Sequence, residues 1–277
     1  MKKLSILATL LLALAIATPG LAHFQMLYTP DCTLSKSKKV DFKLVFTHPF
    51  EAGHTMDMGA PERFFVVHKE KRTNLLDKLK PITWKSLTNQ GKAYELTNYR
   101  LKGLGDFVFC LVPAPYYEGS EDIYIQQCTK MIVNVAGAPT DWDAEIGLPA
   151  EIVPLAKPYA QWTGNVFQGV VKSAGKPVPF AEIEVEYMNH EPDMTKNQFA
   201  TEAQVEAPQD SFVTLGIKAD ANGTFTFAMP KAGWWGFCAL GVGPDTEHQG
   251  KELSQDAVIW VKAVDSDKVR LSGHQHK

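Results

Sequence analysis

The sequence lacks both a charge imbalance and, beyond its first 22 residues, a long apolar run. Its 28 Lys and Arg nearly balance 31 Asp and Glu, giving a net charge of −3, so no basic face is offered to a polyanion. No apolar stretch after residue 22 approaches the roughly 20 residues that a transmembrane helix needs. We therefore expect no nucleic-acid partner and no membrane span of its own in the mature protein.

Catalytic signatures are also missing from the chain. It contains no Gly-x-Ser-x-Gly elbow, no His-Glu-x-x-His motif and no Gly-rich phosphate loop. No pair of carboxylates stands out in an apolar context. We therefore predict that the protein is not an enzyme.

Only four cysteines are present, too few for a disulfide-dense miniprotein. In an oxidising compartment four thiols allow two disulfides in three connectivities. Cys110 and Cys128 lie in successive apolar runs, which fits a pairing across neighbouring strands and leaves Cys32 and Cys238. The alternative is that all four are buried thiols that act as small apolar groups.

The first 22 residues have the pattern of a secretory signal peptide. Two lysines precede an apolar stretch over residues 4–18, and the small residues Gly20 and Ala22 follow. We predict cleavage after Ala22; a site after Ala17 is the alternative and leaves a shorter apolar core. No Cys follows either site, so we expect a soluble periplasmic protein without a lipid anchor.

The rest of the sequence predicts an all-β fold. Residues 40–46 alternate apolar and polar side chains with the period of a half-buried strand. Similar runs occupy residues 64–67, 94–99, 106–112, 123–127, 131–135, 181–187, 212–218, 224–229, 234–237 and 257–264. Only residues 74–80 look weakly helical, and a polar insertion over residues 189–210 would tolerate a helix.

A Pro-broken segment from Asp141 to Pro158 divides the chain and has the composition of a semi-rigid linker. We predict two weakly coupled β-sandwich domains in tandem. The first covers residues 23–155 and the second, of immunoglobulin-like size and texture, covers residues 156–265. Residues 266–277 would form a mobile tail.

Candidate metal ligands gather at the predicted mature N-terminus. A leading His23 offers its α-amine and its imidazole to one metal ion, and the amine has an ordinary pKa of about 7.7–8.0, so a metal can displace its proton. One further imidazole would complete a three-nitrogen site suited to Cu(II) or Ni(II). The candidates close to it in sequence are His48, His54, Met56, Asp57 and Met58. The two methionines taken alone are more typical of packing.

The other histidines fit this site less well. His68 lies within a predicted strand and His190 in the polar insertion. His248 has no converging partners, and His274 and His276 belong to the tail. Residues 220–223 resemble the start of a calcium loop but lack its later carboxylate, so they predict a turn.

Several longer motifs carry a family resemblance. They are residues 48–58 (HPFEAGHTMDM), 112–117 (VPAPYY), 233–237 (GWWGF) and 256–261 (DAVIWV). With them the chain resembles an exported bacterial family of unknown function whose members are labelled nickel or cobalt uptake components, accessory to energy-coupling-factor transporters. The resemblance spans residues 23–265. With residues 175–179 (GKPVP) and 219–223 (ADANG), the second half is also similar to carboxypeptidase-regulatory and collagen-adhesin β-sandwiches.

The resemblance implies capture of Ni(II) or Co(II) in the periplasm and delivery to a membrane importer of the energy-coupling-factor type. The family is sometimes described as a transmembrane component, whereas this sequence has no span after its signal, so we expect an accessory protein. Two alternatives stay open. One is a copper-binding periplasmic protein with an N-terminal His chelate, because Cu(II) outranks Ni(II) at most nitrogen sites. The other is a structural envelope or adhesin-like module.

Overall fold

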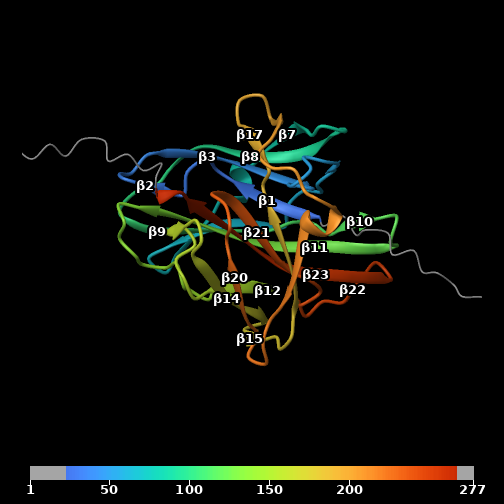
Figure 1. Cartoon of the computed structure of the whole chain (residues 1–277). Coiled ribbons are helices and arrows are strands. Elements are labelled where there is room, and N and C mark those ends of the chain that lie inside the picture. The colour runs from blue at the N-terminus through green and yellow to red at the C-terminus, as the bar shows by residue number, and fades with distance from the viewer. Residues whose placement is uncertain (1–22, 267–277) are drawn as a thin grey trace, which may run out of the picture.

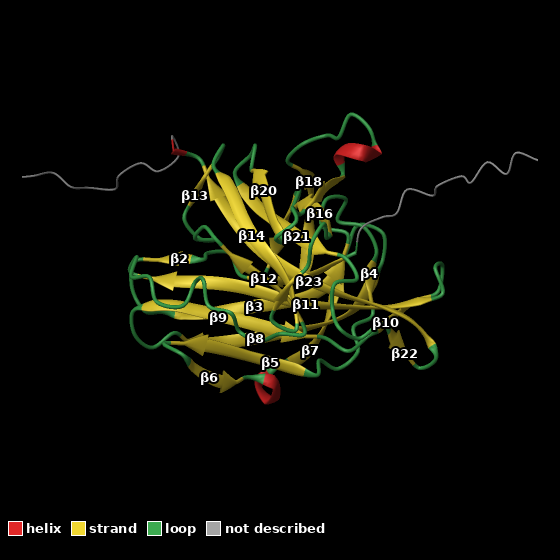
Figure 2. Ribbon diagram, turned by 90° about the horizontal axis from the view of Figure 1, so that it is seen from below, coloured by secondary structure: helices red, strands yellow, loops and turns green. Residues whose placement is uncertain are grey.

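The computed structural model describes residues 23–266. The expected signal peptide and residues 267–277 of the expected tail lie outside these residues. The described chain consists of strands and two short 3-10 helices, η1 (Leu76–Lys78) and η2 (Asp210–Phe212), as Figure 2 shows. Within residues 23–266 no helix has the length and apolarity to cross a membrane. The predicted all-β fold class is confirmed.

The first sheet has seven strands in the order β1-β3-β8-β7-β18-β17, and β4 pairs with β3. Its strands are β1 (Phe24–Tyr28), β3 (Lys39–Thr47), β4 (Thr55–Met56), β7 (Lys80–Lys85), β8 (Gln90–Arg100), β17 (His190–Asp193) and β18 (Gln198–Ala203). The alternating residues 40–46 form most of β3. Residues 189–210, expected to tolerate a helix, instead include the hairpin β17–β18, so that expectation is wrong.

The second sheet has twelve strands and runs through the middle of the molecule (Figure 1). Its main path is β19-β16-β21-β23-β11-β9-β5-β6, and β2, β10, β13 and β22 pair at its margins. The path contains β19 (Thr214–Lys218), β16 (Glu182–Tyr187), β21 (Gly233–Ala239), β23 (Lys251–Val264), β11 (Ile123–Val135), β9 (Gly105–Val112), β5 (Arg63–His68) and β6 (Lys71–Asn74). The marginal strands are β2 (Thr33–Leu34), β10 (Tyr116–Glu118), β13 (Gln161–Trp162) and β22 (Glu247–His248).

The third sheet is small, with the order β12-β14-β15 and β20 paired to β14. It comprises β12 (Ala150–Pro154), β14 (Val166–Ser173), β15 (Lys176–Pro177) and β20 (Thr224–Ala228). Figure 1 shows the first sheet above the long sheet and the third sheet below it. Phe42 packs on Phe109 between the first two layers, with ring centroids 4.2 Å apart, and Phe167 packs on Phe237 between the last two at 5.0 Å. The fold is two sandwiches that share one sheet.

This shared sheet corrects the predicted domain organisation. Strands β11 and β23 come from opposite halves of the chain and pair in parallel from Tyr124↔Leu253 to Met131↔Trp260. The buried hydrophobic residues of both halves form one cluster. Because the halves share hydrogen bonds and a core, the expectation of two weakly coupled domains is wrong.

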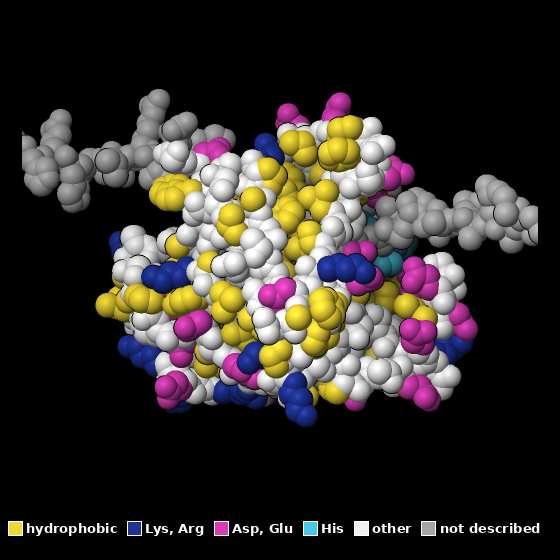
Figure 3. All heavy atoms as spheres, turned by 60° about the horizontal axis from the view of Figure 1, so that its bottom comes forward, with side chains coloured by type: hydrophobic (Ala, Val, Ile, Leu, Met, Phe, Trp, Pro, Cys, Tyr) yellow, Lys and Arg dark blue, Asp and Glu magenta, His cyan; other side chains and the backbone are white. Residues whose placement is uncertain are grey.

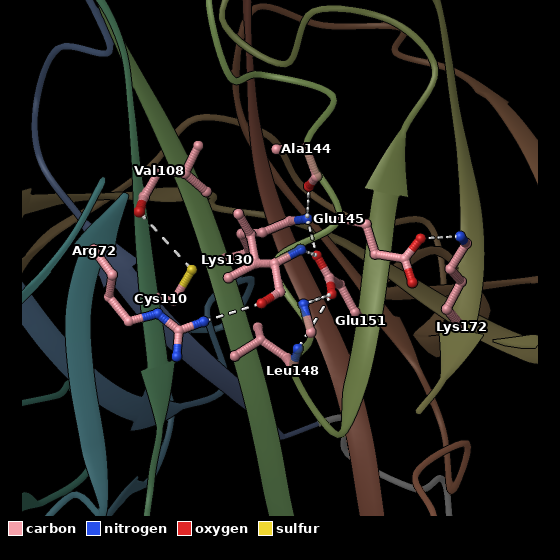
Figure 4. A network of polar contacts seen from close by, with 11 residues as sticks. Arg72, Val108, Cys110, Lys130, Ala144, Glu145, Leu148, Glu151 and Lys172 are labelled. Carbon is pink, nitrogen blue, oxygen red and sulfur yellow. Dashed lines mark hydrogen bonds and ion pairs between the residues drawn. The ribbon is translucent and has the colours of Figure 1, made fainter. Parts of the chain in front are cut away.

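The segment predicted to be a linker is held by carboxylates that accept its backbone N–H groups. Glu151 accepts from Ile146, Gly147 and Leu148 at 2.8–3.2 Å. Its Oε1 also lies 2.6 Å from Nζ of Lys130, and both side chains are almost fully buried (Figure 4). A buried ion pair needs such additional hydrogen bonds to offset desolvation. They fix the path between the two sandwiches.

All four cysteines are buried and none of them forms a disulfide. Extending the β9–β11 register from Val108↔Ile132 places Cys110 opposite Lys130, so Cys128 lies diagonally across from Cys110. Diagonal neighbours are about 7–8 Å apart, beyond ordinary disulfide reach. The expected Cys110–Cys128 disulfide is therefore absent, and the alternative of buried thiols describes the fold.

Candidate functional site

Strand register brings His23, His48 and His54 to one corner of the first sheet. Phe24 pairs with Thr47 between β1 and β3, and Thr47 pairs with Thr55 between β3 and β4. The three histidines lie one position beyond these pairs: His23 precedes Phe24, His48 follows Thr47 and His54 precedes Thr55. Opposed residues of neighbouring antiparallel strands direct their side chains to the same face. The rings of His23 and His48 lie 4.7 Å apart between centroids, inclined at 49°.

The three imidazoles have different surroundings. The His23 side chain is 16% exposed, and its ring also packs on Phe46. His48 is buried. His54 is exposed at the outer side of the row, and its Nε2 lies 3.3 Å from the side-chain amide nitrogen of Asn89. A small ion could therefore reach this corner from solvent on the side of His54.

Carboxylates border the histidine row. Nε2 of His23 lies 3.1 Å from Oε2 of Glu118, the last residue of β10, and Glu121 follows in the next turn. Figure 3 shows histidine at one edge of the molecule with acidic side chains beside it. Sequence reasoning missed Glu118. The only sequence feature around Glu118 is an acidic turn that follows an aromatic run, and nothing in that pattern indicates a contact with His23.

The pKa values of this pair follow from burial and from each other. Burial lowers the pKa of His23 below its ordinary value, with a smaller contribution from His54, and this outweighs the opposite effect of Glu118 and Glu121. Burial alone would raise the pKa of Glu118, but hydrogen bonds from Ser120 and the proximity of His23 lower it. Near neutral pH the His23 imidazole is thus uncharged and the Glu118 carboxylate ionised.

The start of β1 is held by residues from the long sheet. The side-chain Oε1 of Gln127 accepts the N–H of Gln25 at 2.6 Å, and its Nε2 donates to the carbonyl oxygen of His23 at 2.7 Å. The indole N–H of Trp260 donates to the carbonyl oxygen of Gln25 at 2.9 Å. Gln127 is in turn 3.2 Å from the buried carboxylate of Asp256. The first residues of β1 are therefore fixed by both halves of the chain.

Met56, Asp57 and Met58 are not brought into the histidine row. Met56 is buried opposite Phe46. The Sδ of buried Met58 accepts a hydrogen bond from the Gln25 side chain at 3.6 Å. Asp57 accepts the backbone N–H of Lys92 at 2.6 Å. These contacts are those of packing and strand-capping residues, so the structure favours only the histidines of the predicted ligand set.

The remaining histidines have structural contacts. Nδ1 of His68 lies 2.8 Å from the carbonyl oxygen of Asp106, and its ring stacks on Phe107. His190 contacts the carbonyl oxygen of Ala200 in the same way, and His248 packs edge-on against Tyr124. His274 and His276 lie outside the described residues. Asp220 accepts backbone N–H groups of the turn that follows it.

The donor set fits a metal only if the chain terminus contributes. Among residues 23–266 no three His, Cys, Asp or Glu side chains are placed to hold an ion together. His23 and His48 do supply two neighbouring imidazoles. Cleavage after Ala22 would add the α-amine of His23 as a third nitrogen. Nitrogen donors of this kind suit late first-row divalent metals.

Comparisons with known proteins identify the family to which the chain belongs. The D0–D1 domain of intimin is 10% identical, with 87% of this chain and 100% of that chain covered and a TM-score of 0.21. The Yersinia pseudotuberculosis adhesin InvE is 11% identical, with 85% and 58% covered and a TM-score of 0.24. No curated protein matches by sequence. A family profile described as a domain of unknown function (DUF4198) matches residues 21–243, most of the chain, and the protein belongs to that family.

Proposed function

We propose that this protein is a non-enzymatic, periplasmic binder of a divalent transition metal, and that it delivers the ion to a membrane importer of the energy-coupling-factor type. The observation that carries the proposal is the 4.7 Å approach of the His23 and His48 rings at the predicted start of the mature chain. The amine and imidazole of His23 and the imidazole of His48 would hold the ion. Export is supported by the signal-like residues 1–22.

The surroundings of the site support capture of a cation. Glu118 and Glu121 place negative charge near His23, which favours the approach of a positive ion. The lowered pKa of His23 keeps its imidazole unprotonated near neutral pH, and an unprotonated nitrogen is what a metal requires. Affinity would fall as the pH drops through the pKa values of the amine and the imidazoles, because protons then compete with the metal.

Ni(II) or Co(II) is the proposed cargo, on the strength of the family resemblance. Cu(II) is the competing cargo, and one observation favours it: the candidate donors are nitrogens, and Cu(II) binds such sites more tightly than Ni(II) or Co(II). The metal that is delivered to the importer then depends on which of these ions is available in the periplasm. Competition among the three ions on one protein sample separates these possibilities.

The decisive experiment compares two forms of the chain that begins at His23. One has the free α-amine, and the other is acetylated at that nitrogen and so has an amide in place of the amine. Each is titrated calorimetrically with Ni(II), Co(II) and Cu(II). We expect the form with the free amine to bind at least tenfold more tightly, because only this form offers the amine nitrogen, whereas every side chain is common to both. Equal affinities would refute the amine chelate, and no binding by either would favour a structural module.

A further inference from the structure

The contact between His23 and Glu118 has a consequence for which nitrogen of His23 can bind a metal. Nε2 of His23 is 3.1 Å from Oε2 of Glu118, and the two side chains are 16% and 14% exposed. A carboxylate accepts hydrogen bonds and donates none. A neutral imidazole carries one N–H. The contact therefore requires that the hydrogen of neutral His23 sits on Nε2.

The chelate proposed above needs this same arrangement. A ring closed by the α-amine and the imidazole of one histidine runs through Cα, Cβ and Cγ to Nδ1, which gives six members with the metal. Nε2 lies on the far side of the imidazole and cannot close that ring. Nδ1 must therefore hold the free lone pair, and Nε2 must hold the hydrogen. Free imidazole has no such fixed assignment, so the protein has to supply it.

Glu118 is itself held in position. Its Oε1 accepts the backbone N–H of Ser120 at 2.9 Å and the Ser120 hydroxyl at 2.6 Å. These bonds occupy one carboxylate oxygen and leave Oε2 for His23. Strand β10 pairs with β11 up to Glu118↔Ile123, so the backbone that carries Glu118 is also fixed.

We infer that Glu118 is a positioning residue that fixes the Nε2–H tautomer of His23 and so presents Nδ1 to the metal. This inference rests on the proposed function. Metal-bound histidines commonly donate their second N–H to a carboxylate, and loss of such a partner costs about 10- to 100-fold in metal affinity. Ser120 acts one step further out by orienting the carboxylate.

The first test needs no metal. In the chain beginning at His23, nitrogen–proton correlation spectra of the imidazoles report the tautomer directly. We expect His23 in the Nε2–H form in the wild type and a tautomer mixture in Glu118→Ala. A wild type dominated by Nδ1–H or by the doubly protonated ring would overturn the inference, as would an unchanged spectrum in Glu118→Ala. Absence of metal binding by the wild type would instead refute the proposed function.

The second test measures Cu(II) and Ni(II) affinity in matched variants. Glu118→Ala should weaken binding about 10- to 100-fold. Glu118→Gln keeps an acceptor oxygen of similar reach and should recover part of the loss. Glu121→Gln removes a nearby charge without a hydrogen bond to His23 and should change affinity less than about threefold. The tautomer role would be overturned if all three variants, Glu118→Gln, Glu121→Gln and Glu118→Ala, lost the same amount of metal affinity. Such a result would mean that only the negative charge of the glutamates matters.

Discussion

His23 and His48 stand opposite one another at the ends of β1 and β3, with their ring centroids 4.7 Å apart. Both side chains are largely shielded from solvent, and β1 is fixed by Gln127 and Trp260. The two imidazoles are thus adjacent before any ligand arrives. Little conformational entropy is lost on binding when donors are already placed, so a pre-organised pair favours affinity.

The first prediction concerns the second imidazole. His48→Ala should weaken metal binding by at least tenfold, roughly 1.4 kcal/mol, because it removes one of the two adjacent rings. His54→Ala should have a smaller effect, since His54 is exposed and already contacts Asn89. Calorimetric titration of each variant measures the change. His68→Ala is the control, and an equal loss there would show that the wrong histidines were chosen.

A second prediction concerns Gln127. Gln127→Leu leaves the N–H of Gln25 and the carbonyl oxygen of His23 without their partners, at about 1–3 kcal/mol for each buried group. Both the free energy of unfolding and the metal affinity should fall. The neighbouring Gln126 is also buried and bonds to Pro113 and Gln255, away from His23.

Gln126→Leu is therefore the matched control for Gln127→Leu. It should lower stability by a similar amount, measured by urea denaturation, and leave metal affinity unchanged. If both variants lose affinity equally, the effect is one of general stability. Gln127 then has no special part in holding the start of β1.

The sequence predicted local structure well because alternation is a local signal. Residues 40–46 do form a strand, and the predicted runs 123–127 and 131–135 merge into the single strand β11. The sequence did not predict which strands pair with one another. The pairing of β11 with β23 joins segments more than 100 residues apart, and no composition pattern reports such a contact. The hairpin β17–β18 was missed because a Pro and an irregular register interrupt its alternation.

The same limit applied to the site. Two of the predicted ligands, His23 and His48, are brought together by the β1–β3 register, and His54 follows from the β3–β4 turn. Glu118 could not be predicted, because β10 reaches His23 only through the packing of two different sheets. Met58 follows His54 closely in sequence, on the other side of β4, but its side chain contacts the Gln25 side chain. Closeness in sequence therefore indicated which residues belong to the candidate site, but it did not indicate which of their side chains face one another.

A third prediction concerns the buried ion pair of Lys130 and Glu151. Lys130→Met leaves an uncompensated carboxylate in the interior and should cost about 3–5 kcal/mol in unfolding free energy. The exposed pair of Lys172 and Glu145, also drawn in Figure 4, is the control. Lys172→Met should cost less than about 1 kcal/mol. Similar losses in the two variants would show that burial does not distinguish the pairs.

A fourth prediction concerns the thiols. Burial raises the pKa of Cys32 to about 11 and the pKa values of Cys110 and Cys128 to about 12, and it also raises that of Cys238. Thiolates are the reactive form, so the folded protein should react very slowly with a thiol reagent and all four thiols should react in guanidinium. A reductant should not change the melting temperature. Fewer than four reactive thiols after unfolding would reveal a disulfide.

The last prediction uses the buried carboxyl of Glu186 on β16. Burial raises its pKa to about 8, with the charges of Glu184 and Glu51 acting in the same direction, although its Oε1 accepts a hydrogen bond from Thr214 and its Oε2 one from the N–H of Phe50. In the unfolded chain the group has its ordinary pKa of 4.5. Between these values the folded state binds one more proton than the unfolded state. Stability must therefore fall as the pH rises through this window, by roughly 1.4 kcal/mol per pH unit.

Comparison of the wild type with Glu186→Gln between pH 6.5 and 8.5 isolates this effect. Burial lowers the pKa of His23 from 6.5, so the unfolded chain binds the His23 proton more readily, and His23 adds a slope of opposite sign that fades within about one pH unit above 6.5. Glu184, whose pKa burial raises to about 7, contributes only in the lower part of the range. Glu186→Gln keeps the size of the side chain and removes the ionisation, so urea denaturation should show a much flatter pH profile. Glu182→Gln, on the exposed part of the same strand, should leave the slope unchanged, and a wild-type stability that rises from pH 6.5 to 8 would contradict a protonated Glu186.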